Sequence, residues 1–178
     1  MRKVTYGAAC SLDGFITGPG GSLDWLHWSK DAEAIMASYW KTVDTILMGR
    51  KTWEIAAASR ESGPMDQNIQ SYVFSRTLTA IDRPGVTLVK TDPGEFVREL
   101  KARAGGDICV LGGSDLARSL LAAGVVDEVG CNVHPVLLGS GVPLFVDCGR
   151  RIGLTLSECR PIDGGCIYMG YTVRSADG

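Results

Sequence analysis

The chain has 178 residues, of which 45% are hydrophobic and 21% charged, and its 18 basic and 20 acidic residues give a formal net charge of −2. This length predicts one domain spanning residues 1–178, large enough to bury a stable hydrophobic core without disulfide bonds or bound metal ions. The composition excludes a disordered, collagen-like or coiled-coil chain. The absence of a basic stripe argues against nucleic-acid binding, and no apolar run reaches the roughly 18 residues of a membrane span.

The first third of the sequence predicts strands alternating with helices. A strand is expected over Lys3–Cys10, followed by turn signals at Asp13-Gly14 and Gly18-Pro19-Gly20-Gly21. Apolar residues at helical spacing predict a helix over Asp31–Trp40. The short apolar run Thr45–Met48 then predicts a buried strand that leads into a second helix, which ends near Ala58.

The middle of the sequence continues this alternation. Strands are expected at Ser71–Phe74, Val86–Val89 and Asp107–Leu111. The helix before the last of these has a strong start signal, because Asp92 is a suitable N-cap, Pro93 suits the first helical position and Glu95 completes a capping box. A further helix runs through Ala123, and Gly124 is its natural stop.

After residue 125 the pattern changes to strands without intervening helices, at Val126–Val133, Leu154–Glu158 and Cys166–Val173. We therefore expect a three-layer α/β fold with a mixed, mostly parallel sheet and antiparallel strands at the C-terminal end.

The six cysteines provide information on the cellular compartment. No two of them have the C-x-x-C spacing of a zinc ribbon or a thioredoxin-type site, so no metal site is expected. Cys109 and Cys131 lie in apolar strand-like runs, where free cysteine behaves as a small hydrophobic residue. We expect free thiols and a reducing, cytoplasmic location. The basic start of the chain is not followed by the apolar segment of a secretory signal.

Two strand-to-helix junctions have the composition of a phosphate site. They are Ile46-Leu47-Met48-Gly49-Arg50-Lys51-Thr52 and Val110-Leu111-Gly112-Gly113-Ser114-Asp115. Ligands of open α/β sheets bind beyond the carboxyl ends of the strands, and helix N-termini there offer unpaired N–H groups to an anion. Neither the dinucleotide fingerprint G-x-G-x-x-G nor a P-loop is present. Each glycine could also simply permit a tight turn.

These residues resemble a known superfamily. The stretch Leu47-Met48-Gly49-Arg50-Lys51-Thr52-Trp53-Glu54 is similar to the NADPH-binding segment of dihydrofolate reductases, and Tyr72-Val73-Phe74-Ser75-Arg76-Thr77 resembles the next segment of that fold. Val110–Ser114 resembles its paired-glycine turn, where the family has a cis Gly-Gly peptide. A closer resemblance is to the reductase domain of riboflavin-biosynthesis deaminase-reductases, and it is carried by Ser11–Ile16 and Pro135–Phe145.

The resemblance implies NADPH as the hydride donor and a set of residues that bind it. Ala9, Phe15 and Ile16 would line the nicotinamide end. Gly49, Arg50, Lys51 and Thr52 would hold the phosphates, and Ser75 and Arg76 would meet the adenosine 2′-phosphate. Leu111, Gly112, Gly113, Ser114 and Leu116 would cover the pyrophosphate and the nicotinamide ribose.

Hydride transfer also requires a group that supplies or relays a proton. The resemblance implies a carboxylate on the first long helix, which places Glu33 in this role with Asp31 as the alternative; either could instead be a solvated charge. Asp13 and Asp24 are interpreted as turn or cap residues and His134 as a structural or interface group. Trp25 or Trp28 could flank a planar heterocycle.

The function expected from these features is NADPH-dependent reduction of a small heterocycle, with 5-amino-6-(5-phosphoribosylamino)uracil as the candidate substrate. Two alternatives stay open: a dihydrofolate or pteridine reductase, and a non-catalytic NADP-binding protein of the same fold. The zinc deaminase signature is absent, so the chain would supply only the reductase step. The apolar, glycine-rich segment Val133–Phe145 further leads us to expect a homodimer.

Overall fold

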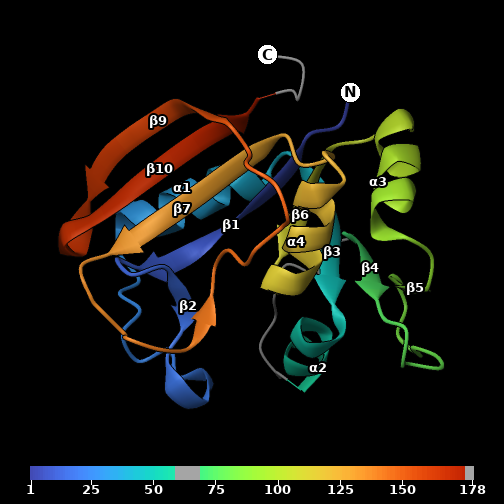
Figure 1. Ribbon diagram of the computed structural model, residues 1–178, viewed down its shortest axis with the longest axis horizontal. Coiled ribbons are helices and arrows are strands. Elements are labelled where there is room, and N and C mark those ends of the chain that lie inside the picture. Colours follow the sequence, from blue (N-terminus) through green and yellow to red (C-terminus); the bar gives the residue numbers. More distant parts are fainter. Residues whose placement is uncertain (59–68, 175–178) are drawn as a thin grey trace.

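The computed structural model describes residues 1–58 and 69–174, and these form an eight-stranded sheet flanked by helices (Figure 1). The strand order is β5-β4-β3-β6-β1-β7-β10-β9, and β2 and β8 form a separate small pair. The strands are β1 Val4–Ser11, β2 Phe15–Thr17, β3 Val43–Gly49, β4 Gln70–Phe74, β5 Val86–Val89, β6 Asp107–Leu111, β7 Glu128–His134, β8 Val142–Pro143, β9 Leu154–Ile162 and β10 Cys166–Val173. The helices are α1 Lys30–Trp40, α2 Arg50–Ala58, α3 Pro93–Ala102 and α4 Ser114–Ala122.

The sheet is mixed and mostly parallel, as predicted. All neighbouring pairs from β5 across to β7 are parallel, whereas β10 is antiparallel to β7 and β9 is antiparallel to β10. The central strand β3 has the continuous apolar composition of a strand covered on both faces: Ile46, Leu47 and Met48 are fully buried. The α/β fold class read from the sequence is therefore confirmed.

Helices cover both faces of the sheet and complete three layers. In Figure 1, α3 and α4 lie in front of the sheet and α1 lies behind it. Residues of α3 and α4, such as Val97 and Leu120, pack with Val4 and Tyr6 of β1 in the larger core cluster. Trp53 of α2 packs on the opposite face with Ile46.

The element boundaries differ from prediction mainly in the C-terminal third. β7 begins at Glu128 rather than residue 126, and β9 continues to Ile162 because it pairs with β10 along its whole length. The short strands β2 and β8 were not predicted. They pair only with one another, through Phe15 and Pro143, so their strand character depends on a contact that the local sequence does not encode.

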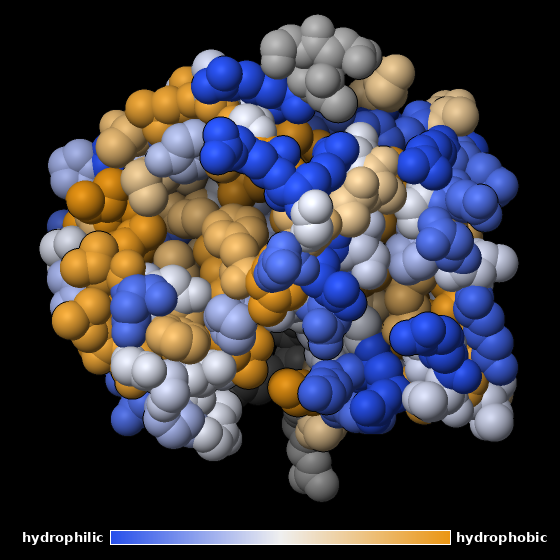
Figure 2. All heavy atoms as spheres, in the orientation of Figure 1, coloured by the Kyte–Doolittle hydropathy of each residue, from blue (hydrophilic) through white to orange (hydrophobic). Residues whose placement is uncertain are grey.

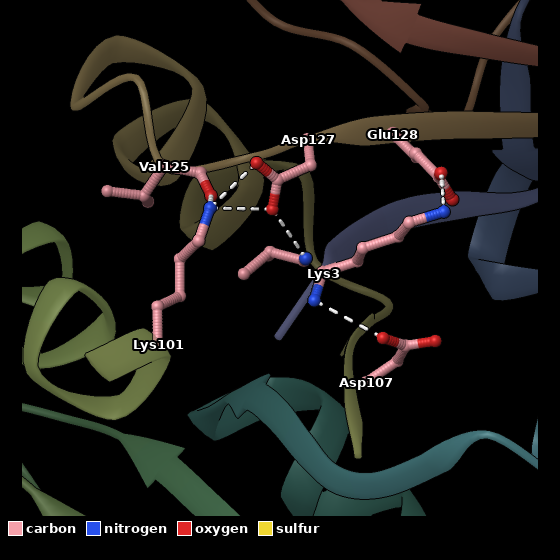
Figure 3. Close-up of polar contacts among 7 residues, drawn as sticks. Lys3, Lys101, Asp107, Val125, Asp127 and Glu128 are labelled. Atoms are coloured by element: carbon pink, nitrogen blue, oxygen red, sulfur yellow. Dashed lines mark hydrogen bonds and ion pairs between the residues drawn. The ribbon is translucent and has the colours of Figure 1, made fainter. Parts of the chain in front are cut away.

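The amino ends of the parallel strands are held together by a polar network (Figure 3). The backbone N–H of Lys3 donates to Asp107 at 3.2 Å, and that of Val4 donates to Asp127 at 2.8 Å. The Lys101 ammonium, which is largely buried, donates to the Asp127 carboxylate at 2.6 Å. These contacts connect the starts of β1, β6 and β7, and they leave the opposite edge of the sheet, where these strands end, for binding.

Two further expectations concern cysteine and the membrane. All six cysteines are unpaired thiols. Within residues 1–58 and 69–174, no helix is long and apolar enough to cross a bilayer.

Candidate functional site

A cavity of about 770 Å³ lies where β3, β4 and β5 end and where α2, α3 and α4 begin. Its position fits the rule that open α/β sheets bind ligands beyond the carboxyl ends of their strands. The volume is within the usual range for small-molecule and cofactor sites. The lining residues are Gly49, Arg50, Lys51, Thr52, Phe74, Ser75, Arg76, Val89, Lys90, Thr91, Asp92, Pro93, Gly113, Asp115, Leu116, Arg118 and Ser119.

The cavity brings together the two glycine junctions that the sequence singled out, although they are about sixty residues apart. A Cβ built on Gly112 would lie 2.7 Å from Thr52 Oγ1, so the two junctions are in direct contact and only glycine fits there. At Gly49 an added Cβ would meet no atom of the described residues within 4 Å, so this residue leaves room beside the backbone. Of the proposed cofactor residues, those that line the cavity are Gly49, Arg50, Lys51, Thr52, Ser75, Arg76, Gly113 and Leu116.

The paired-glycine turn differs from the resemblance in one respect. The described residues contain no cis peptide bond, so the Gly112–Gly113 bond is trans. The chain turns here because Gly112 and Gly113 both take positive φ, 65° and 49°, a conformation that costs glycine little. Gly113 is the N-cap of α4 and supplies no side-chain hydrogen bond. The first N–H groups of α4 are therefore available to a ligand.

The cavity is lined by more cations than anions. It has five cationic side chains and two carboxylates: Arg50, Lys51, Arg76, Lys90 and Arg118 against Asp92 and Asp115. Asp92 is already engaged, since its carboxylate accepts from the Glu95 N–H at 3.0 Å and caps α3. The Arg50 guanidinium donates to Glu54 one turn further along α2, at 2.7 Å. The net positive lining suits an anion such as a phosphate group.

Ser75 and Arg76 follow β4 and play different structural parts. Ser75 is buried, and its Oγ accepts from the N–H groups of Thr77 and Leu78 at 3.2 and 3.0 Å, which shapes the turn. Arg76 is exposed at the cavity wall. Ser75 therefore orients the turn, and Arg76 contributes to the cavity lining.

Sequence reasoning missed two of the cations, Lys90 and Arg118. Lys90 follows β5, which becomes the edge strand beside β4, and Arg118 lies one turn into α4. The signal for Lys90 was available, because Val86–Val89 is a third strand that leads into a helix start at Asp92. Only the strand order places this junction beside the other two.

The other proposed cofactor residues lie near the same sheet edge but outside the cavity lining. Leu111 ends β6, Gly112 follows it and Ser114 begins α4. Ala9 is on β1, and Phe15 and Ile16 are on β2. Pairing of β1 with β6 stops at Tyr6, whereas pairing with β7 continues to Ser11. The end of β1 that carries Ala9 is thus left open on the side of the paired glycines.

The candidate proton donors do not line this cavity. Glu33 and Asp31 are exposed on the first turn of α1, and the Asp31 carboxylate accepts from the Asp163 N–H at 3.1 Å. Asp24 is also exposed. Asp13 acts as the turn residue that was expected. Its carboxylate accepts from the Ser11 hydroxyl and from the N–H groups of Gly139 and Leu138, and these hydrogen bonds lower its pKa.

His134 ends β7 and is only 1% exposed. Its Nδ1 lies 3.5 Å from the His27 backbone nitrogen and 3.4 Å from Cys166 Sγ. The Trp25 ring contacts it edge to face with centroids 5.2 Å apart, while Trp28 is 55% exposed. Burial, with a smaller contribution from His27, lowers the pKa of His134, so the imidazole is neutral at pH 7.

Comparison with known proteins agrees with this architecture. The family model of the RibD C-terminal domain matches residues 2–168. The uncharacterised protein YyaP of Bacillus subtilis is 32% identical over 181 residues, which cover 96% of this chain and 95% of YyaP.

Two solved structures illustrate the fold. A Shewanella sp. PV-4 protein, described as a candidate riboflavin biosynthesis protein, has a TM-score of 0.87 and 24% identity, with 98% of this chain and all of the other covered. Dihydrofolate reductase from Enterococcus faecalis, complexed with NADP(H) and RAB-propyl, has a TM-score of 0.69 and 17% identity, with 97% of each chain covered. The chain therefore belongs to the RibD C-terminal domain family and has the fold of dihydrofolate reductase.

Proposed function

We propose that this protein is an NADPH-dependent reductase of a small heterocycle, with 5-amino-6-(5-phosphoribosylamino)uracil as the candidate substrate. The observation that carries the proposal is the cationic cavity, which joins two glycine junctions of one sheet edge. Its shape and charge fit a ligand with several phosphates. Family membership supports reductase chemistry, and the Enterococcus faecalis enzyme of the same fold binds NADP(H).

The residues present fit the phosphate portion of the cofactor. Gly49 leaves room for close approach, Lys51 and Thr52 supply donors beside it, and α4 offers unpaired N–H groups that start after Gly113. Arg76 would take the 2′-phosphate, because a planar guanidinium matches phosphate oxygens. Lys90 and Arg118 add positive charge to the same walls.

When bound, NADPH supplies the hydride for the reaction. In the proposed step, the carbonyl carbon of the ring-opened ribose takes the hydride, its oxygen takes a proton, and an alcohol forms. Ala9, Phe15 and Ile16 would place the nicotinamide at the open end of β1. Glu33, which is exposed on the first turn of α1, or a bound water molecule would assist the transfer of a proton to the carbonyl oxygen.

The test combines cofactor binding with turnover. Titration of the protein with NADPH and NADH should give tighter binding of NADPH, and NADPH absorbance should fall when 5-amino-6-(5-phosphoribosylamino)uracil is added. Turnover of dihydrofolate alone would favour the pteridine alternative, and NADPH binding with no turnover of either compound would favour a non-catalytic NADP-binding protein. Failure of NADPH to bind at millimolar concentration would overturn the proposal.

We also propose that the protein is a homodimer. Hydrophobic residues gather on the side of the surface that carries β9, β10 and the loop after β7 (Figure 2). Leu137, Val142 and Phe145 of the late segment are 70%, 43% and 47% exposed, which favours burial against another surface. Light scattering should give twice the chain mass of 19.0 kDa, and a monomer mass would contradict this assembly.

A further inference from the structure

Two polar side-chain atoms of β7 are buried without a hydrogen-bond partner in the described part of the chain: Asn132 Oδ1 and His134 Nε2. The residues are two apart on one strand, so they share a face of the sheet. Cys131 and Val133, which alternate with them, pack in the core under α3 and α4. Asn132 and His134 therefore face the opposite layer, the side of α1.

Such atoms are uncommon, because leaving a buried donor or acceptor unpaired costs about 1–3 kcal/mol. Each one in a native fold calls for a specific explanation. Here an acceptor and a donor occur together at the carboxyl end of β7. That end belongs to the same sheet edge as the cofactor cavity, because β7, β1 and β6 are parallel.

The hydrogen-bond role of His134 follows from its neighbours. The His27 backbone N–H can only donate, so His134 Nδ1, 3.5 Å away, is the acceptor of that contact. The proton of the neutral ring is thereby assigned to Nε2. Nε2–H is thus a buried donor that lacks an acceptor among residues 1–58 and 69–174. The Trp25 ring and Cys166 fix the orientation of the imidazole.

The position of Asn132 relates it to the proposed reaction. In the sheet register it lies between Ala9 on β1 and Tyr168 on β10. Neighbouring strands are about 4.8 Å apart. If a heterocycle stacked on a nicotinamide at Ala9, the edge of its ring would therefore lie next to the Asn132 amide.

We propose that Asn132 and His134 form a substrate-positioning pair that hydrogen-bonds to the edge of a lactam heterocycle. The ring of a uracil carries alternating N–H and C=O groups. It can thus donate to Asn132 Oδ1 and accept from His134 Nε2–H, satisfying both unpaired atoms. This inference rests on the proposed function and names the substrate class: a heterocycle with ring N–H and C=O groups side by side.

The test uses Asn132→Leu, which keeps the size of the side chain and removes its polar atoms, and His134→Gln. The matched control is Val133→Ala, on the same strand but the opposite face. The first readout is kinetic, with 5-amino-6-(5-phosphoribosylamino)uracil as substrate. Each variant of the pair should lower kcat/KM about 10- to 100-fold, mostly through KM. The control should keep its kinetic constants, and NADPH affinity should be unchanged in all three.

A second readout separates positioning from a purely structural role. Asn132→Leu removes an unpaired buried acceptor, so its thermal midpoint without ligand should equal or exceed that of the wild type. Calorimetric binding of the same uracil in the presence of NADP+ should nevertheless weaken in parallel with kcat/KM.

The outcomes distinguish this inference from the proposed function. Absence of NADPH binding by the wild type refutes the proposed function. NADPH binding, combined with uracil binding that is equal in the wild type and Asn132→Leu, refutes only the positioning pair. A wild type that binds NADPH but does not bind the uracil also refutes the pair.

Discussion

On one side of β1, the parallel strands β6, β3, β4 and β5 end at a cavity bordered by helix N-termini, whereas on the other side β7 is followed by two antiparallel strands with no helix between them. The first side presents cations and backbone N–H groups at a cavity, which suits phosphates. The second side presents the neutral, buried Asn132 Oδ1 and His134 Nε2, which suit an uncharged ring. The two halves of this sheet edge therefore differ in charge and in burial, so they suit different chemical groups.

The largest effect is expected at the contact between the glycine junctions. Gly112→Ala should lower the free energy of unfolding by about 2–4 kcal/mol, since it combines an unfavourable positive φ with overpacking against Thr52. Gly149→Ala, before β9, is the control: its φ is 75°, but no atom of the residues that the structure describes lies within 4 Å of an added Cβ. Urea unfolding should give it a cost of only about 1–2 kcal/mol. Equal costs at the two positions would show that the junctions are not in tight contact.

A smaller but more specific effect is expected at Arg76. Arg76→Ala should weaken NADPH binding about 10- to 100-fold, through loss of a charge-assisted contact with phosphate, and leave NADH binding nearly unchanged. Arg160→Ala, an exposed cation of β9, is the control from the antiparallel side and should change neither. Equal loss of NADPH and NADH affinity in Arg76→Ala would remove the 2′-phosphate assignment.

The smallest effect concerns the pH dependence of stability. The pKa of His134 is lowered in the folded protein. As the pH falls below the usual histidine pKa of about 6.5, the unfolded chain therefore binds a proton at this histidine more readily than the folded protein does. The free energy of unfolding decreases as the pH is lowered. His134→Gln should therefore show a shallower fall of the thermal midpoint between about pH 7.5 and 5.5, by about 1–3 °C. Parallel midpoint curves for the variant and the wild type would contradict a buried neutral imidazole.

The comparison also explains what the sequence could predict. The junction at Gly49–Thr52 was predictable because an apolar strand, a glycine and a helix start follow one another locally. Lys90 and Arg118 were not singled out, because their approach to that junction depends on the strand order. Asn132 gave no local signal, since a single amide in a strand is ordinary until the pairing of β7 with β1 and β10 places it at this edge of the sheet with a buried Oδ1. Glu33 was selected through the resemblance alone, and its side chain is exposed on the first turn of α1.

The central claim is that the cofactor occupies the parallel side of β1, and hydrogen exchange measured by mass spectrometry with and without NADPH tests it most directly. We expect NADPH to slow exchange in the first turns of α2 and α4 and in residues 74–76, with little change in β9 and β10. Protection confined to β9 and β10, or no protection at saturating NADPH, would contradict it.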